Sequence, residues 1–330
     1  MKKHLVLWCL GLFAFLSLAG SGANSGDRFA WEVLIDICRP QAKGALGPES
    51  PVAWRLWSTQ REVFPRPQAP DVLVPASKGN FDEIRRLRCE LLTQQSMFAP
   101  TPSKEANNEE PQCEVVFLND SATKYILDKK IYLRSYLALA AASAPGIHLP
   151  SAAREIKTEW RTIKSPQFGD YIVATDDSNQ TWGLVALHLM THEQPKWFWA
   201  TWIHKDYARF AQLHDSFGAT ANGEISDELR QLLKSNSELV LSNYKLIGSQ
   251  TEFQPLTLNN PLIEGNLVCS SCMGCHQNAG LRRDGSWSPP RPCDMMAETP
   301  LPTGLSPTDF DFSLASQSKC HGVGGCKDAQ

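Results

Sequence analysis

Three residues near the C-terminal end have types and a spacing that can do chemistry. Cys272, Cys275 and His276 form a C-x-x-C-H motif, the pattern of covalent attachment of a c-type haem. Two residues between the cysteines let the sulfurs reach the two vinyl groups on one edge of a porphyrin, and the adjacent imidazole can then ligate the iron. The motif therefore predicts one covalent haem c, bound through Cys272 and Cys275, with His276 as the proximal iron ligand.

Chance explains this motif poorly. The chain has 10 Cys and 8 His among 330 residues, so fewer than about one random chain in a hundred of this composition would contain C-x-x-C-H. Cys269 extends the motif to C-x-x-C-x-x-C, which also begins some iron–sulfur cluster motifs. The alternatives are therefore an iron–sulfur cluster, a zinc site or a group of disulfides.

The N-terminal residues bear on this choice. Lys2 and Lys3 precede an apolar run over residues 5–18, and small residues follow. This pattern predicts a secretory signal peptide over residues 1–23 and hence a periplasmic or otherwise exported protein. A membrane anchor is the alternative, but the run is shorter than the roughly 20 residues that span a bilayer. Export of an unfolded chain suits haem attachment after export, whereas a pre-assembled cluster needs the twin-arginine route, whose signal this N-terminus lacks.

Charge and the other cysteines narrow the function further. The formal net charge is −3, with 32 basic and 35 acidic residues, so no basic stripe indicates nucleic-acid binding. We also expect no transmembrane segment after residue 23. Removing the two haem cysteines from the nine of the exported chain leaves seven, and an oxidising compartment makes disulfides among them expected. Cys320 with Cys326 and Cys269 with Cys293 are two candidate pairings.

Hydrophobic periodicity predicts an α+β fold in which an antiparallel sheet is flanked by peripheral helices and followed by a loop-rich, haem-bearing C-terminal region. Three regions should follow the signal peptide: a helical and loop-rich region over 24–113, an α+β core over 114–250 and the haem-binding region over 251–330. The predicted helices are 29–38, 81–96, 122–128, 132–142 and 227–241, and the predicted strands are 156–163, 170–175, 182–190 and 196–204.

One predicted strand carries alternating charged side chains. Glu155, Lys157, Glu159 and Arg161 alternate with less polar neighbours, a pattern typical of a strand with one face in solvent. We therefore expect these four side chains to be hydrated.

Several segments resemble successive motifs of a family of bacterial exported cytochrome c proteins that carry a single C-terminal C-x-x-C-H motif. The segments are Phe29-Ala-Trp-Glu, residues 149–160, residues 183–188, Trp199-Ala-Thr-Trp-Ile-His204, Leu246-Ile-Gly-Ser-Gln250, residues 270–276 and residues 309–314. The resemblance covers about residues 29–314 and implies a haem and an exported location, without naming a substrate. The chain departs from the family at Ile203, where an acidic residue is usual, and at residues 36–40, where a more apolar ending is usual.

The sequence does not determine which residue, if any, would bind the haem iron on the side opposite His276. His204 is our first candidate for a distal ligand, because it ends an aromatic strand in a family-like motif and shares a strand face with Phe198 and Trp202. An open sixth position is equally compatible with the sequence. The competing ligands are His188, Met190, His192, Met295 and Met296.

Two classes of function follow from a covalent haem. An exported protein with both axial positions filled would transfer single electrons to a redox protein partner whose identity the sequence does not indicate. A haem with an open position would instead serve a peroxidase-like enzyme or a ligand sensor, with a polar group such as His204 or Arg161 above the iron. The first class is the main prediction and the second is the alternative.

Overall fold

The structure is a computed structural model that describes part of the chain. The described residues are 23–39, 52–64, 90–91, 112–164, 167, 169–211, 226–233, 239–253, 257–264, 271–282, 286–287, 303–309, 311 and 313–314. The predicted signal peptide up to residue 22 lies outside them, as do both members of each candidate disulfide pair and the two methionines 295 and 296.

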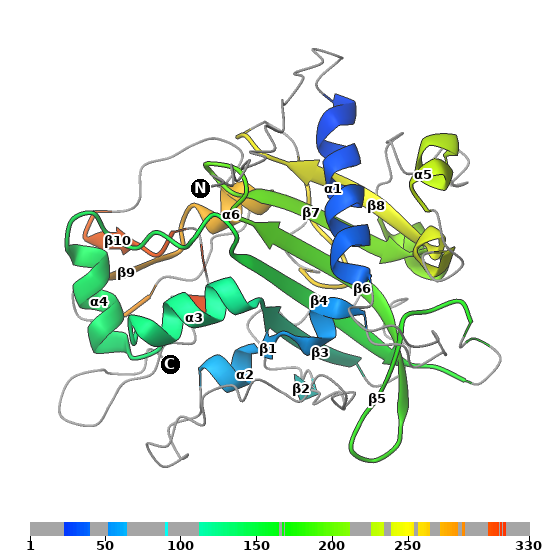
Figure 1. Cartoon of the computed structure of the whole chain (residues 1–330), viewed down its shortest axis with the longest axis horizontal. Helices are drawn as coiled ribbons and strands as arrows, with labels where there is room; N and C mark the ends of the chain where they lie inside the picture. The colour runs from blue at the N-terminus through cyan, green and yellow to red at the C-terminus, as the bar shows by residue number, and fades with distance from the viewer. Residues whose placement is uncertain are drawn as a thin grey trace, which may run out of the picture.

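The described strands form one antiparallel sheet of eight strands, in the order β1-β3-β4-β6-β7-β8, with β2 paired to β3 and β5 paired to β6 (Figure 1). β9 and β10 form a separate antiparallel pair. The strand bounds are β1 Ser58–Thr59, β2 Glu90–Leu91, β3 Gln112–Leu118, β4 Arg154–Thr162, β5 Val173–Thr175, β6 Thr181–Thr191, β7 Phe198–His204, β8 Tyr244–Gln250, β9 Gly280–Arg282 and β10 Leu305–Pro307.

Helices lie on both sides of this sheet. Figure 1 shows α1 crossing one face, α3 and α4 together at one side, and α6 beside the sheet end where β7 begins. The α-helix bounds are α1 Ala23–Cys38, α2 Gln60–Val63, α3 Asp120–Asp128, α4 Arg134–Ala142, α5 Asp227–Leu232 and α6 Cys272–His276, and the 3-10 helices are η1 Ala53–Leu56, η3 Lys205–Phe210 and η4 Leu239–Asn243.

The two faces of the sheet bury different cores because side chains alternate along each strand. The α1 face carries Trp160, Phe198 and Trp202, and α1 packs on it: Phe29 contacts Phe198 edge-on at 4.8 Å between ring centroids, and Trp31 contacts Trp202 at 5.9 Å. The opposite face, which we call the α6 face, carries Met190, Trp199 and Ile203, and its core includes Cys272 and Met273 of α6. The sheet is therefore a middle layer, covered on both sides.

The predicted α+β class, with an antiparallel sheet and peripheral helices, is confirmed. The strands over 156–163, 182–190 and 196–204 correspond to β4, β6 and β7, and the helix over 29–38 to α1. The strands β1, β2, β3, β8, β9 and β10 were not predicted. β3 begins at Gln112 and so crosses the expected boundary between the first two regions, and β1 from the first region pairs with it.

The helix predicted over 81–96 is wrong where the structure describes it. Glu90 and Leu91 form β2, which pairs antiparallel with β3 so that Leu91 lies opposite Cys113. Pairing with a strand 22 residues later overrides the local helical preference. Local periodicity could not predict this, because it carries no information about a distant partner strand. The remaining residues of that prediction lie outside the described part of the chain.

The packing of α1 generates a stability prediction. Trp31 is fully buried against the α1 face, so Trp31→Ala should lower the free energy of unfolding by roughly 3–5 kcal/mol, the usual cost of truncating a large core aromatic side chain. The measurement is urea-induced unfolding followed by circular dichroism.

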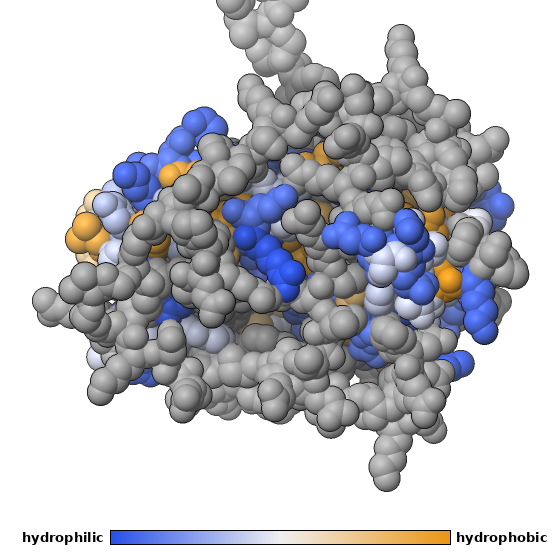
Figure 2. Space-filling view, turned by 90° about the horizontal axis from the view of Figure 1, so that it is seen from below, coloured by the Kyte–Doolittle hydropathy of each residue, from blue (hydrophilic) through white to orange (hydrophobic). Residues whose placement is uncertain are grey.

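A surface substitution in α4 supplies the control. Tyr136 and Leu139 are 47% and 68% exposed, and Figure 2 shows hydrophobic atoms at the side of the molecule where α4 lies. Leu139→Ala should change the free energy of unfolding by less than about 0.5 kcal/mol. Equal effects of the two substitutions would contradict the packing of α1 on the sheet.

Candidate functional site

The C-x-x-C-H motif forms a single turn of helix, α6, from Cys272 to His276. Ser271 caps it: its Oγ accepts a hydrogen bond from the backbone N–H of Gly274 at 3.1 Å, and its carbonyl accepts one from Cys275 N–H at 2.9 Å. A side-chain oxygen that satisfies one of the first N–H groups is what a short helix needs at its start. The turn thus places both cysteines and the histidine on a defined backbone.

The end of β8 anchors this turn to the sheet. Gln250 Oε1 accepts a hydrogen bond from the backbone N–H of Met273 at 3.0 Å, and Gln250 Nε2 lies 3.4 Å from Ser271 Oγ as a donor. Met273 is fully buried in the core of the α6 face. A buried hydrogen bond and a buried side chain next to each other therefore fix where the motif lies.

The segment over residues 257–264 covers the α6 face beside the motif. Cys272 donates a hydrogen bond from its Sγ to the carbonyl of Leu258 at 3.7 Å. Leu258 lies so close to β8 that a Cβ on Gly248 would be 2.8 Å from its Cδ1, so a larger residue at position 248 would make the Leu258 side chain shift. Asn260 donates to Thr201 Oγ1 at 2.9 Å and to the Trp202 carbonyl at 2.8 Å, which ties the segment to β7.

The first cysteine of the motif is enclosed by these contacts. Cys272 is 5% exposed, whereas Cys275 is partly exposed. Burial raises the pKa of the Cys272 thiol well above its usual range, and the nearby Glu264 carboxylate adds to the rise. Both Cys272 and Cys275 are thiols in this structure.

The imidazole of His276 lies against two side chains of the α6 face. Its ring centroid is 5.8 Å from that of Trp199 on β7 and 6.3 Å from that of His188 on β6. The two imidazole rings are nearly parallel, with 11° between their planes. The sheet therefore presents a second histidine directly to the histidine of the motif.

His188 has an unusual environment for a histidine. It is 6% exposed, and neither ring nitrogen has a hydrogen-bond partner among the described residues. The closest charged group is Glu264, whose Oε1 lies 3.6 Å from His188 Nδ1, longer than a hydrogen bond. Burial lowers the pKa of the imidazole to about 3, and the positive charge of Lys157 on the neighbouring strand adds to this. His188 is therefore neutral near pH 7, with a lone pair on one ring nitrogen.

The charged row of β4 shares the α6 face with His188, since Lys157 pairs with His188 across the two strands. The expectation of a hydrated row is wrong: Glu159 and Arg161 are 1% and 3% exposed, and Lys157 and Glu155 are partly buried. The reason is that β4 is a central strand of a sheet covered on both faces. Lys157 Nζ forms an ion pair with Glu114 at 3.0 Å.

Glu159 is the most isolated of these charged groups. Neither of its carboxyl oxygens has a hydrogen-bond partner among the described residues. Burial raises the pKa of the Glu159 carboxyl well above its usual range, and the Glu114 carboxylate raises it further, although Arg161 and Lys157 oppose the rise. A buried carboxyl without a partner is expected to hold a proton rather than a charge.

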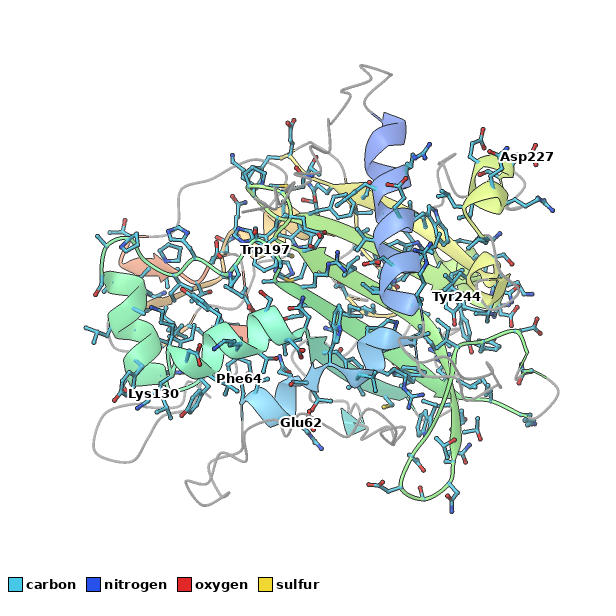
Figure 3. The ribbon with its side chains drawn as sticks, viewed as in Figure 1. Glu62, Phe64, Lys130, Trp197, Asp227 and Tyr244 are labelled. Carbon is cyan, nitrogen blue, oxygen red and sulfur yellow. The ribbon has the colours of Figure 1, made fainter. Side chains whose placement is uncertain are left out.

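The structure places His204 away from the motif. Trp197 and Tyr244, labelled in Figure 3, lie at opposite ends of the sheet, and His204 ends β7 beside Tyr244. His204 Nε2 bonds to the Asp170 carbonyl at 3.1 Å, and His204 Nδ1 accepts from the Asp206 N–H at 3.3 Å. Both ring nitrogens are thus occupied, and the strand face that His204 shares with Phe198 and Trp202 meets α1 rather than α6.

The other candidates for a distal ligand have different positions. Met190 is 2% exposed and packs in the core of the α6 face. His192 bonds through Nδ1 to the Pro150 carbonyl at 3.2 Å, and its ring stacks on Trp197 at 4.7 Å between centroids. Met295 and Met296 lie outside the described residues. The structure brings His188, and not His204, together with His276.

The sequence ranked one contributor to this site, His188, below His204, and it gave no indication of the other, Glu264. His188 was one competitor among several, because its run of apolar neighbours gives no sign of which strand face it occupies. Glu264 was not singled out at all, since a lone glutamate in a loop has no spacing pattern. The signal that could have favoured His188 is the alternation along β6, once the face that meets the motif is known.

Other features limit the alternatives only in part. Within the described ranges, His, Cys, Asp and Glu side chains nowhere gather in a group of three or more that could hold a metal ion. Cys269 lies outside these ranges, so the iron–sulfur and zinc alternatives stay predictions. Cys113 is in a disulfide. Considering the same part of the chain, no helix has the length and apolar character that a membrane crossing needs.

Comparisons with protein-family models, with curated proteins and with solved structures find no match for this chain.

The buried carboxyl of Glu159 generates a pH prediction. Because its pKa is higher in the folded chain than in the unfolded chain, the unfolded chain loses its proton first as the pH rises, and stability falls over that interval. Glu159→Gln removes this titration. The stability of the variant relative to the wild type should therefore grow with pH above about 4, by about 1.4 kcal/mol for each pH unit up to the folded-state pKa.

Urea unfolding at a series of pH values measures this difference. The exposed Glu228→Gln on α5 serves as the matched control, and its stability relative to the wild type should change little with pH. A Glu159→Gln profile parallel to that of the wild type would refute the raised pKa.

Proposed function

We propose that this protein is an exported c-type cytochrome that binds one covalent haem and transfers single electrons. The observation that carries the proposal is the seating of the C-x-x-C-H turn on the α6 face, which turns His276 toward Trp199 and His188. Cys272 and Cys275 would hold the porphyrin by thioether bonds, and His276 would ligate its iron. A haem bound in this way cycles between ferric and ferrous iron, which is the chemistry of a single-electron carrier.

The residues of the α6 face fit such a group. Among the residues that the structure describes, the two buried ring nitrogens of His188 and the buried Nε of Arg161 have no hydrogen-bond partner. Buried polar atoms of this kind normally have a partner in a native protein, and a haem offers both an iron and two anionic propionates. Trp199 and the core around Met273 supply the apolar wall that a porphyrin needs.

The compartment agrees with this proposal. The N-terminal pattern of a signal peptide predicts export, and a disulfide at Cys113 is typical of an oxidising compartment. The resemblance of the seven sequence segments to exported cytochrome c proteins supports the same conclusion. The partner would be another redox protein.

A haem enzyme or ligand sensor with an open iron position is the alternative. One observation favours it: the carboxyl group of Glu159 lies buried on the same face as His188, and burial raises its pKa well above the usual range. A protonated acid near an open iron could donate a proton to a bound ligand. Arg161 lies on that face too, whereas His204 does not.

Covalent attachment is the direct test of the proposal. The full chain, expressed with its signal peptide in a host that attaches c-type haem, should keep haem peroxidase activity on a denaturing gel. Replacing both cysteines in Cys272→Ser/Cys275→Ser should abolish that stain, because no thioether can form. Cys38→Ser, which changes a cysteine outside the motif, is the control and should keep the stain. Haem that acid-acetone extracts, or iron with labile sulfide, would refute the assignment.

The role of His276 gives a separate prediction. His276→Ala leaves both thioethers able to form, so the gel stain should remain while the visible spectrum shifts, because the proximal nitrogen is lost. Absorption spectra of the oxidised and reduced protein measure the shift. Spectra identical to those of the wild type would show that another residue is the proximal ligand.

A further inference from the structure

Haem attachment through the motif accounts for His276, but it does not explain why His188 lies beside it. His188 lies in the middle of β6, where both neighbouring strands cover its edges, and it is 6% exposed. A buried imidazole without hydrogen bonds costs free energy, because both its donor and its acceptor have lost water. The position is therefore expected to have a partner that the described part of the chain does not supply.

The separation of the two rings is longer than direct ring contact and leaves room for a partner. Parallel rings in direct contact lie about 3.5–4 Å apart, but these centroids are 6.3 Å apart. An imidazole nitrogen binds a transition metal at about 2 Å, and the ring centre lies about 1 Å beyond that nitrogen. Two imidazoles on opposite sides of one iron therefore have centres about 6 Å apart, which agrees with the observed pair.

Glu264 stands where a carboxylate supports a metal-binding histidine. A ligand histidine usually donates its other ring N–H to a carboxylate or a carbonyl, which fixes the tautomer and the ring orientation. Glu264 Oε1 is 3.6 Å from His188 Nδ1, and Glu264 Oε2 accepts the backbone N–H of Asn260 at 2.6 Å. Asn260 in turn bonds to β7, so the carboxylate is held beside Nδ1 and leaves Nε2 for a metal.

The competing histidines lack these properties. His204 uses both ring nitrogens in hydrogen bonds, and His192 uses Nδ1 for the Pro150 carbonyl while its ring stacks on Trp197. Of the candidates that the structure describes, His188 combines burial, nitrogens without partners and a parallel ring next to His276.

We propose that His188 is the second axial ligand of the haem iron, opposite His276, so that the iron is held by two histidines. This inference rests on the proposed haem and deepens the proposed function. With both axial positions filled by protein, the iron has no place for a substrate or a gas. The protein is then an electron carrier, and the proton held by Glu159 is not delivered to an iron-bound ligand.

The test uses the full chain with its haem attached, and it compares the wild type with His188→Ala. The ferric wild type should be low-spin, and the ferrous form should not take up carbon monoxide readily. Loss of one imidazole in His188→Ala should convert the iron to high-spin and let the ferrous form bind carbon monoxide at once. Added free imidazole should restore the low-spin spectrum of this variant by occupying the vacated position.

Matched variants separate ligation from general damage. His204→Gln and His192→Gln should keep the low-spin spectrum. His188→Met replaces the imidazole with a side chain of similar size that can ligate through sulfur, so this variant should stay low-spin with a higher reduction potential than the wild type. Electron paramagnetic resonance of the wild-type ferric protein reads the two nitrogen ligands directly and needs no variant to fold.

The outcomes distinguish this inference from the proposed function. A wild-type protein with covalent haem that is high-spin, or His188 variants with unchanged spectra and potential, would overturn the ligand assignment and leave the cytochrome in place. Conversion to high-spin by His204→Gln alone would assign the ligand to His204. A protein without covalent haem on the denaturing gel would overturn the cytochrome proposal itself.

Discussion

The hydrogen bond from the backbone N–H of Met273 to the side chain of Gln250 is the contact on which the site depends. It joins the one turn that carries both cysteines and His276 to the end of β8, the edge strand of the sheet. A helix of five residues has little stability of its own, so its position must come from tertiary contacts such as this one. Removing the acceptor would leave a buried N–H without a partner, at a cost of about 1–3 kcal/mol.

The α6 face buries ionisable side chains, which an ordinary apolar core does not contain. Lys157 is balanced by Glu114 at 3.0 Å, but Glu159 and His188 have no hydrogen-bond partner for their side chains in the described part of the chain. A buried polar group without hydrogen bonds lowers the stability of the fold. Such groups are therefore rare in an ordinary core and are found mainly at functional sites. On the α1 face, by contrast, the described contacts are between aromatic rings, and Trp31 packs there on Trp202. The two faces thus divide stability and chemistry between them.

Features marked by a local sequence pattern could be predicted, whereas features that depend on tertiary contacts could not. The apolar run of β6 and the alternation of β7 are local, and both strands were predicted. β3 mixes Gln112, Cys113 and Glu114 with later apolar residues, and its partner strand begins some forty residues on, so no local pattern marks it. The charged row of β4 has the period of a hydrated strand, and only the layer that covers it makes it buried. The same limit applies to the histidines: alternation grouped His204 with Phe198 and Trp202, but it could not say that this face meets α1.

The enclosure of Cys272 constrains when the proposed haem could be attached. Its sulfur lies beneath the 257–264 segment, bonded to the Leu258 carbonyl, and is 5% exposed. In the proposed cytochrome, an enzyme that joined this sulfur to a porphyrin would have to reach it before the segment closed over β8. Because Cys272 follows the 257–264 segment closely in the sequence, thioether formation in the proposed cytochrome would compete with the folding of this segment. A chain in which Leu258 packed against β8 first would have the sulfur enclosed before attachment.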